Sequence, residues 1–206
     1  MIRTVPLGPR NRLAHLIVTA LSEERARGEL DTLAGVNAVP DGWLAPDEMS
    51  HAPALVARVR RAAEAVRGFP LVPRELILDD ALAAAALLFD AGLYFETHEV
   101  LEPAWRNARG RLRETLQGLI QVAVGYQHLA NGNMAGARAL LDEGVARLRR
   151  SRTDAEDVSV REGRDASLAR SLHELSRFVD GFTASLGDLS DPERMTVPPF
   201  PRLDRT

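Results

Sequence analysis

Cysteine and lysine are both missing from this 206-residue chain, in which arginine supplies all 26 basic side chains. Without cysteine, the chain can form neither a disulfide framework nor a thiolate metal site. Its longest apolar run, residues 81–89, is far too short to span a bilayer. The first amphipathic segment, residues 13–21, continues into charged residues and does not resemble a signal peptide. These absences predict a cytoplasmic protein that has no membrane partner.

The chain also lacks a block of one charge, because its net charge is only −3. This balance argues against general binding of polyanions, so nucleic acid is not expected as the main partner. The sequence does not indicate an oligomeric state. With 45% hydrophobic residues, the chain is long enough to bury one sizeable core.

The spacing of apolar residues predicts an all-α protein with no strand of useful length. Glycines or Asn-Gly pairs end several of the periodic segments. A long Gly-, Pro- and Asp-rich connection is expected over residues 29–52, and a polar, mobile one over 151–163. A tail with four prolines is expected to be extended or disordered from Asp188. The predicted helices are 11–27, 53–67, 81–91, 93–106, 112–130, 135–150 and 168–186.

An internal repeat relates residues 88–97 to residues 128–137. The pattern of each copy predicts the end of a helix, a Gly turn and the start of another helix. This pattern is similar to the hairpin turn of tetratricopeptide repeats at a longer period, although any two Gly-terminated hairpins share it. We therefore expect an antiparallel helical bundle with tetratricopeptide-like hairpins. Its expected parts are an N-terminal helical extension (1–75), a core of hairpins (76–152), a C-terminal helix packed on the core (153–187) and a Pro-rich tail (188–206).

The predicted helix 93–106 carries polar groups on a stripe that should face the core. At 100° per residue, Glu96 and Glu99 point away from this stripe. A polar pair facing the core costs stability unless its hydrogen bonds are satisfied. The stripe consists of Tyr94, His98, Leu101, Glu102 and Trp105.

The neighbouring helix, 112–130, is apolar except along one line that contains Gln117, Gln121 and His128. If the two helices pack antiparallel through a loop near residue 109, His98 faces Gln121 and Glu102 faces Gln117. His128 then lies about 10 Å further along the axis, outside the compact cluster.

Three interpretations of this cluster stay open. The glutamines could satisfy His98 and Glu102 in a purely structural hydrogen-bond network. The imidazole and carboxylate could instead bind a divalent metal, the one cofactor that the pattern allows, although two good ligands fall short of a closed site. They could also act as an acid–base pair in a small-molecule pocket. The second histidine of a zincin motif is replaced by Glu102, and no phosphate-binding loop is present.

Several motif residues fall in order along the region 80–150: Phe89, Gly92, Tyr94, Phe95, Glu96, His98, Glu99, Glu102, Trp105, the segment 116–121, His128, Gly132 and Asn133. In these residues the chain resembles a prokaryotic family, domain of unknown function 309. That family has an all-helical fold and a His-x3-Glu-x2-Trp motif, but no established biochemical activity. The resemblance therefore implies the fold and the position of the site, and not a reaction. The family's usual asparagine is Asp90 here.

The bundle order also predicts that two arginine-rich segments, 106–113 and 147–152, meet at one end. Acidic neighbours could neutralise this end, or it could dock a phosphate-bearing or acidic partner. Taken together, the sequence favours a non-enzymatic helical module that binds a small ligand or a protein partner around His98 and Glu102. The alternative is a metal-dependent or acid–base hydrolase that uses the same two residues.

Overall fold

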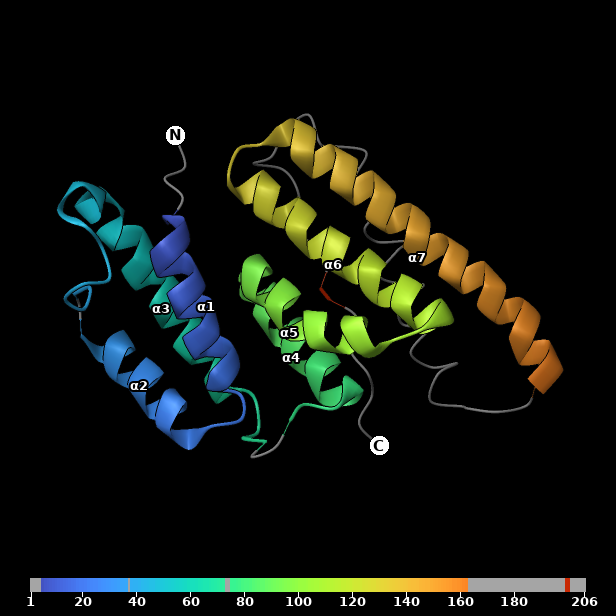
Figure 1. Cartoon of the computed structure of the whole chain (residues 1–206), viewed down its shortest axis with the longest axis horizontal. Helices are drawn as coiled ribbons and strands as arrows, with labels where there is room; N and C mark the ends of the chain where they lie inside the picture. Colours follow the sequence, from blue (N-terminus) through green and yellow to red (C-terminus); the bar gives the residue numbers. More distant parts are fainter. Residues whose placement is uncertain (1–4, 37, 73–74, 163–198, 201–206) are drawn as a thin grey trace. The chain divides into compact units, whose positions relative to one another are not determined.

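A computed structural model describes residues 5–36, 38–72, 75–162 and 199–200. Within these ranges every regular element is helical and none is a strand, which confirms the all-α prediction (Figure 1). The elements are α1 (Leu7–Thr19), α2 (Glu24–Gly35), the 3-10 helix η1 (Pro46–His51), α3 (Ala52–Arg67), α4 (Leu78–Asp90), α5 (Tyr94–Asn107), α6 (Gly110–Ala130) and α7 (Met134–Glu162).

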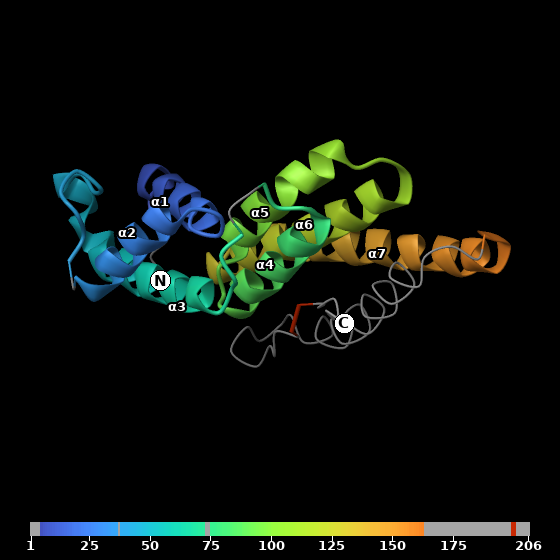
Figure 2. The ribbon, with the colours of Figure 1, turned by 90° about the horizontal axis from the view of Figure 1, so that it is seen from below.

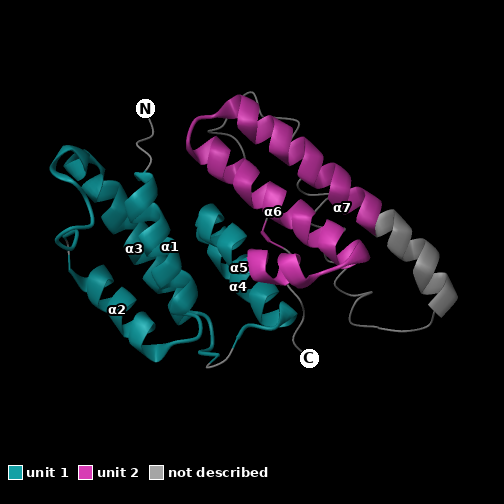
Figure 3. Cartoon of the chain, viewed as in Figure 1, with its two compact units in different colours: residues 1–100 teal, residues 101–206 magenta. Residues whose placement is uncertain are grey.

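The chain divides into two compact units, residues 1–100 and 101–206, so that the division falls inside α5 (Figure 3). In the first unit, α3 is the central helix and contacts α1, α2 and α4. Its apolar stripe recurs every three or four residues, which is the period of one helix face. The buried residues of this stripe are Leu55, Val59, Ala62, Ala63 and Val66.

The predicted helix 11–27 is wrong in its extent, because the chain turns at residues 20–23 and starts a second helix there. The guanidinium of Arg27 donates to the carbonyl oxygens of Ala20 and Phe69, so α2 is tied to the end of α1 and to the end of α3. The predicted connection 29–52 is likewise shorter, since α2 and η1 occupy much of it. In α2, tertiary contacts outweigh the low helix propensity of Gly28.

The two copies of the repeat form the same turn. Gly92 ends α4 and Gly132 ends α6 with φ of 70° and 75°, a conformation that favours glycine. After each glycine, the next amide donates five residues back, from Leu93 to Leu88 and from Asn133 to His128. This is the hydrogen bond of a Schellman motif, which satisfies carbonyls at a helix end. The repeat found in the sequence is therefore a repeat of turn geometry.

In the second unit, α6 and α7 form an antiparallel hairpin with extensive contact (Figure 2). Glycines on α6 allow the two helices to approach closely. A Cβ atom on Gly118 would lie 2.8 Å from Leu148 Cγ, and one on Gly125 would lie 2.7 Å from Leu141 Cγ. Both leucines are fully buried. Side chains of α7 thus fill the space that these glycines leave.

The polar segment 151–163 was expected to be mobile, but α7 continues as a helix to Glu162. The polar composition of this segment did not predict a helix. Helix α7 is longer than α6, and the part of α7 beyond its contact with α6 needs no apolar stripe. The predicted helix 168–186 and nearly all of the Pro-rich tail lie outside the described residues; Phe200, at the end of the tail, is buried. None of the described helices has a stretch apolar and long enough to cross a membrane.

Candidate functional site

Three potential metal-ligating side chains lie together on α5. His98, Glu99 and Glu102 each offer one nitrogen or oxygen atom, and these atoms all lie within 4.8 Å of one another. Their spacing of one and four residues places them on neighbouring turns of a single continuous helix. We call these three residues the α5 cluster.

Each member of the α5 cluster is partly exposed. The side chain of His98 is 25% exposed and that of Glu102 is 26% exposed, so ligands in solvent can reach both. His98 Nδ1 lies 3.3 Å from Glu99 Oε1, and Arg106 Nη2 donates to Glu102 Oε1 at 2.7 Å. Glu99, which the helical wheel turned away from the stripe, therefore joins His98.

The two aromatic residues of the predicted stripe have distinct surroundings. Tyr94, at the start of α5, packs edge-on against Phe89 with ring centroids 5.0 Å apart. Burial raises the pKa of the Tyr94 hydroxyl, and the charge of Asp90 raises it further against the opposing effect of Arg61. Trp105, near the end of α5, has the guanidinium of Arg113 above its ring at 4.2 Å.

Two polar residues of α6, Gln121 and His128, have partners on the segments that follow α6. Gln121 is buried and hydrogen-bonds with Glu143 of α7, while Gln117 is half-buried. His128 lies on the last turn of α6, and its Nδ1 atom is 2.8 Å from the side-chain nitrogen Nδ2 of Asn133. Glu102 pairs with Arg106 through one of its two carboxylate oxygens. The links from His98 and Glu102 to glutamines of α6 stay predictions.

Glu143 makes the α6–α7 hairpin sensitive to acid. Hydrogen bonds from Gln121 and from Arg147 lower the pKa of its carboxyl below the ordinary value of 4.5. A depressed pKa gives stability that is present above the unfolded pKa and is lost as the pH falls through the folded one. We therefore expect Glu143→Gln to flatten the loss of thermal stability below about pH 4.5. Melting temperatures at pH 7, 4 and 3 measure this; parallel curves for both proteins would contradict it.

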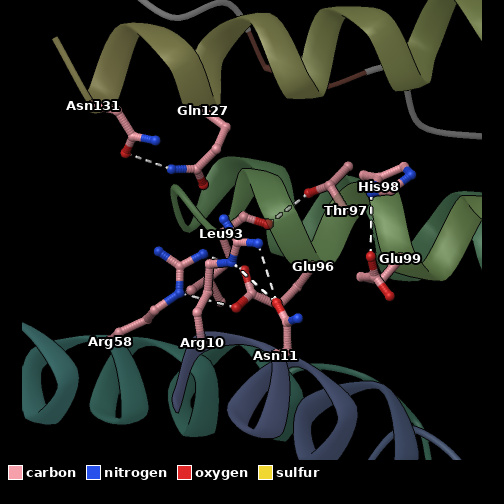
Figure 4. Close-up of polar contacts among 10 residues, drawn as sticks. All are labelled: Arg10, Asn11, Arg58, Leu93, Glu96, Thr97, His98, Glu99, Gln127 and Asn131. Atoms are coloured by element: carbon pink, nitrogen blue, oxygen red, sulfur yellow. Dashed lines mark hydrogen bonds and ion pairs between the residues drawn. The ribbon is translucent and has the colours of Figure 1, made fainter. Parts of the chain in front are cut away.

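The most buried charge of α5 is Glu96, which the helical period had placed away from the core-facing stripe. Glu96 is completely buried and accepts two hydrogen bonds from Arg58 of α3, one of them 2.9 Å between Arg58 Nε and Glu96 Oε1. Figure 4 shows Glu96 turned toward Arg58, with His98 and Glu99 further along the same helix. A sequence signal did exist, because Arg58 occupies a position three residues after Leu55 and four before Ala62, within the apolar stripe of α3.

Arg10 of α1 adds a second cation to this region. Its guanidinium lies 3.9 Å from the ring centroid of Phe95, and it hydrogen-bonds to the side-chain oxygen of its neighbour Asn11. Burial lowers the pKa of Arg10, as does repulsion from Arg58, while the charges of Glu96 and Glu99 act in the opposite direction. Arg10 is therefore electrostatically coupled to a member of the α5 cluster.

The predicted meeting of two arginine-rich segments occurs in the second unit. Arg147 of α7 donates to Glu114, near the start of α6, at 2.6 Å and to Glu143 at 2.9 Å. Arg113 donates to the backbone oxygens of Trp105 and Arg106. Much of the positive charge at this end is thus already used within the fold.

The motif residues and the Gly turns fall inside a family match. Residues 82–140 match the family model described as "Domain of unknown function (DUF309)". Residues 82–140 are therefore similar to the DUF309 family. The matched region contains α5, α6, both Gly turns and the whole α5 cluster, whereas α1, α2 and α3 precede it.

One curated relative is similar to about half of this chain. The chain is 30% identical over 99 residues to "Uncharacterized protein YpuF" from Bacillus subtilis (strain 168). The match covers 48% of this chain and 57% of that protein. No solved structure matches this chain significantly. Neither the family description nor the relative's name supplies a ligand or a reaction.

Proposed function

We propose that this protein is a helical binding module whose ligand or partner binds at the face of α5 around His98 and Glu102. The observation that carries the proposal is the α5 cluster, in which one imidazole and two carboxylates lie within 4.8 Å and are partly exposed. Two acidic groups and a nitrogen ligand favour a cationic group, such as a divalent ion or an amine of a small molecule or protein.

The partners of Glu102 indicate how such a ligand would bind. Arg106 already bonds to Glu102 from the next turn, and its side chain is 67% exposed. Exposed ion pairs of this kind contribute about 0–1 kcal/mol, so an incoming cation can displace the guanidinium at low cost. The same competition keeps affinity modest. The tetratricopeptide-like character of the hairpins is part of this proposal, because that kind of fold presents helix faces to partners.

Isothermal titration with Zn²⁺ tests the proposal, since imidazole and carboxylate both bind this ion. We expect the purified protein to contain no stoichiometric transition metal, because the α5 cluster is open and has no cysteine. Added Zn²⁺ should bind the wild type at one site, and His98→Ala and Glu102→Gln should each remove most of this binding.

His128→Ala is the matched control, because His128 is another partly exposed histidine of the region that matches the family model. It should bind Zn²⁺ like the wild type. Equal loss in His128→Ala and His98→Ala would contradict a site at the α5 cluster. About one equivalent of zinc, iron or manganese retained through purification would instead favour a closed metal centre.

A metal-dependent or acid–base hydrolase is the second candidate, and the third ligating group, Glu99, is the observation that favours it. A mononuclear catalytic site needs three protein ligands and an open position. His98 beside Glu99 also forms a pair that can transfer a proton. Hydrolysis of a generic ester that depends on added metal and is lost in His98→Ala would promote this candidate.

The arginine-rich end is proposed as a weak docking surface and not as the main site. Exposed arginine contacts to phosphate are screened at about 0.15 M salt, and the net charge of −3 opposes long-range attraction. We expect duplex DNA or RNA to bind no tighter than about 10⁻⁶ M at that salt. Fluorescence anisotropy measures this; submicromolar binding that Arg111→Ala/Arg113→Ala abolishes would make nucleic acid the leading partner.

A further inference from the structure

The N-terminal helices hold the first turns of α5 through a buried ion pair. Glu96 is completely buried, the Arg58 side chain is only 11% exposed, and two hydrogen bonds join them. A guanidinium and a carboxylate with two parallel bonds fix each other's orientation. Because Glu96 lies two residues before His98, the Arg58–Glu96 ion pair fixes the helix turn on which the α5 cluster begins.

A second contact extends from α1 toward the α5 cluster. The Arg10 guanidinium stacks on Phe95 at 3.9 Å, and the Phe95 and His98 rings are 6.1 Å apart. His98 Nδ1 in turn lies 3.3 Å from Glu99 Oε1. Phe95 therefore has Arg10 on one side and His98 on the other, and His98 is followed by Glu99 (Figure 4 labels Arg10, His98 and Glu99). The charge of Glu99 raises the pKa of Arg10, so the charges of these two residues interact.

We propose that the N-terminal helices tune the α5 cluster: Arg58 positions α5, and Arg10 places a positive charge that limits the affinity of the cluster for cations. This inference rests on the proposed binding function and assigns a role to residues outside the DUF309 match. Arg10 and Arg58 are positioning residues that act through Phe95, Glu96 and Glu99. Movement of α1 away from α5 would then raise cation affinity without changing any ligand.

The direction of the effect separates this role from a structural one. Loss of a supporting residue loosens a site and weakens binding. Loss of a repelling charge strengthens binding, by about twofold to tenfold for a charge near a partly exposed site. Methionine at position 10 keeps an apolar side chain on Phe95 and removes the charge, whereas lysine keeps the charge.

Zn²⁺ titrations of the full-length wild type, Arg10→Met and Arg10→Lys test the proposal. Arg10→Met should bind Zn²⁺ about twofold to tenfold more tightly, and Arg10→Lys should resemble the wild type. Arg12→Met is the matched control, because Arg12 also lies on α1 and stacks on an aromatic ring, that of Trp43 at 4.7 Å. Unchanged or weaker binding in Arg10→Met, or an equal gain in Arg12→Met, would overturn the proposal.

A metal-free measurement keeps the inference separate from the binding function. If the wild type binds no Zn²⁺, the proposed function fails, and a double-mutant cycle between Arg10→Met and Glu99→Gln then decides the inference. We expect the unfolding equilibrium constants to deviate from multiplicativity by at least about twofold, as for residues that interact. Independent effects of the two substitutions would show that Arg10 does not act on Glu99.

Discussion

Replacing Glu96 by alanine is expected to lower the free energy of unfolding by about 3–5 kcal/mol, because the buried guanidinium of Arg58 then loses its charged partner. Urea denaturation followed by circular dichroism measures the change. Asp31→Ala is the control, since Asp31 and Arg67 form an ion pair in the same helical unit with side chains 41% and 55% exposed. That substitution should cost no more than about 1 kcal/mol.

The ion pair is expected to matter more for specificity of packing than for net stability. Replacement of a buried pair by apolar side chains of similar size is often neutral. Glu96→Leu/Arg58→Met should therefore be clearly more stable than Glu96→Ala. If Glu96→Ala costs as little as Asp31→Ala, the pair does not hold α5 to α3, and its positioning role is wrong.

Gly125→Ala should destabilise the α6–α7 hairpin by about 1–3 kcal/mol, the usual cost of overpacking. The added Cβ would meet Leu141 at 2.5 Å from Cδ2 and 2.7 Å from Cγ, and Leu141 is fully buried. Gly28→Ala is the matched control in α2, where no atom lies within 4 Å of the added Cβ.

The control, Gly28→Ala, should be more stable than the wild type. Alanine in place of an unhindered helical glycine stabilises by about 0.5–1 kcal/mol. Thermal and urea denaturation of both variants give the comparison. A Gly125→Ala protein as stable as the wild type would show that α7 can withdraw from α6, and that the close approach of the two helices is not required.

The sequence was sufficient for the helices that end at strong local signals. Gly68, Gly92 and the Asn131-Gly132 pair mark the ends of α3, α4 and α6, and local turn chemistry decides such ends. The break between α1 and α2 was missed, because Arg27 reaches across the chain to Phe69 and no local pattern shows that contact.

Part of the site was also predictable, because local patterns are visible in the sequence and contacts between distant residues are not. The period of α5 places His98 and Glu102 on neighbouring turns, and both belong to the α5 cluster. Glu99 was assigned to another face, because a helical wheel reports backbone angles and not the reach of a side chain. Glu96 was missed, since its partner Arg58 is 38 residues away in the sequence.

The most direct test of the binding site is paramagnetic broadening of amide signals by Mn²⁺ in the full-length protein. We expect substoichiometric Mn²⁺ to broaden the amides of residues 98–102 on α5 first and most strongly, and His98→Ala to abolish this effect. Uniform broadening, or broadening centred on another segment and unchanged in His98→Ala, would contradict a binding site at the α5 cluster.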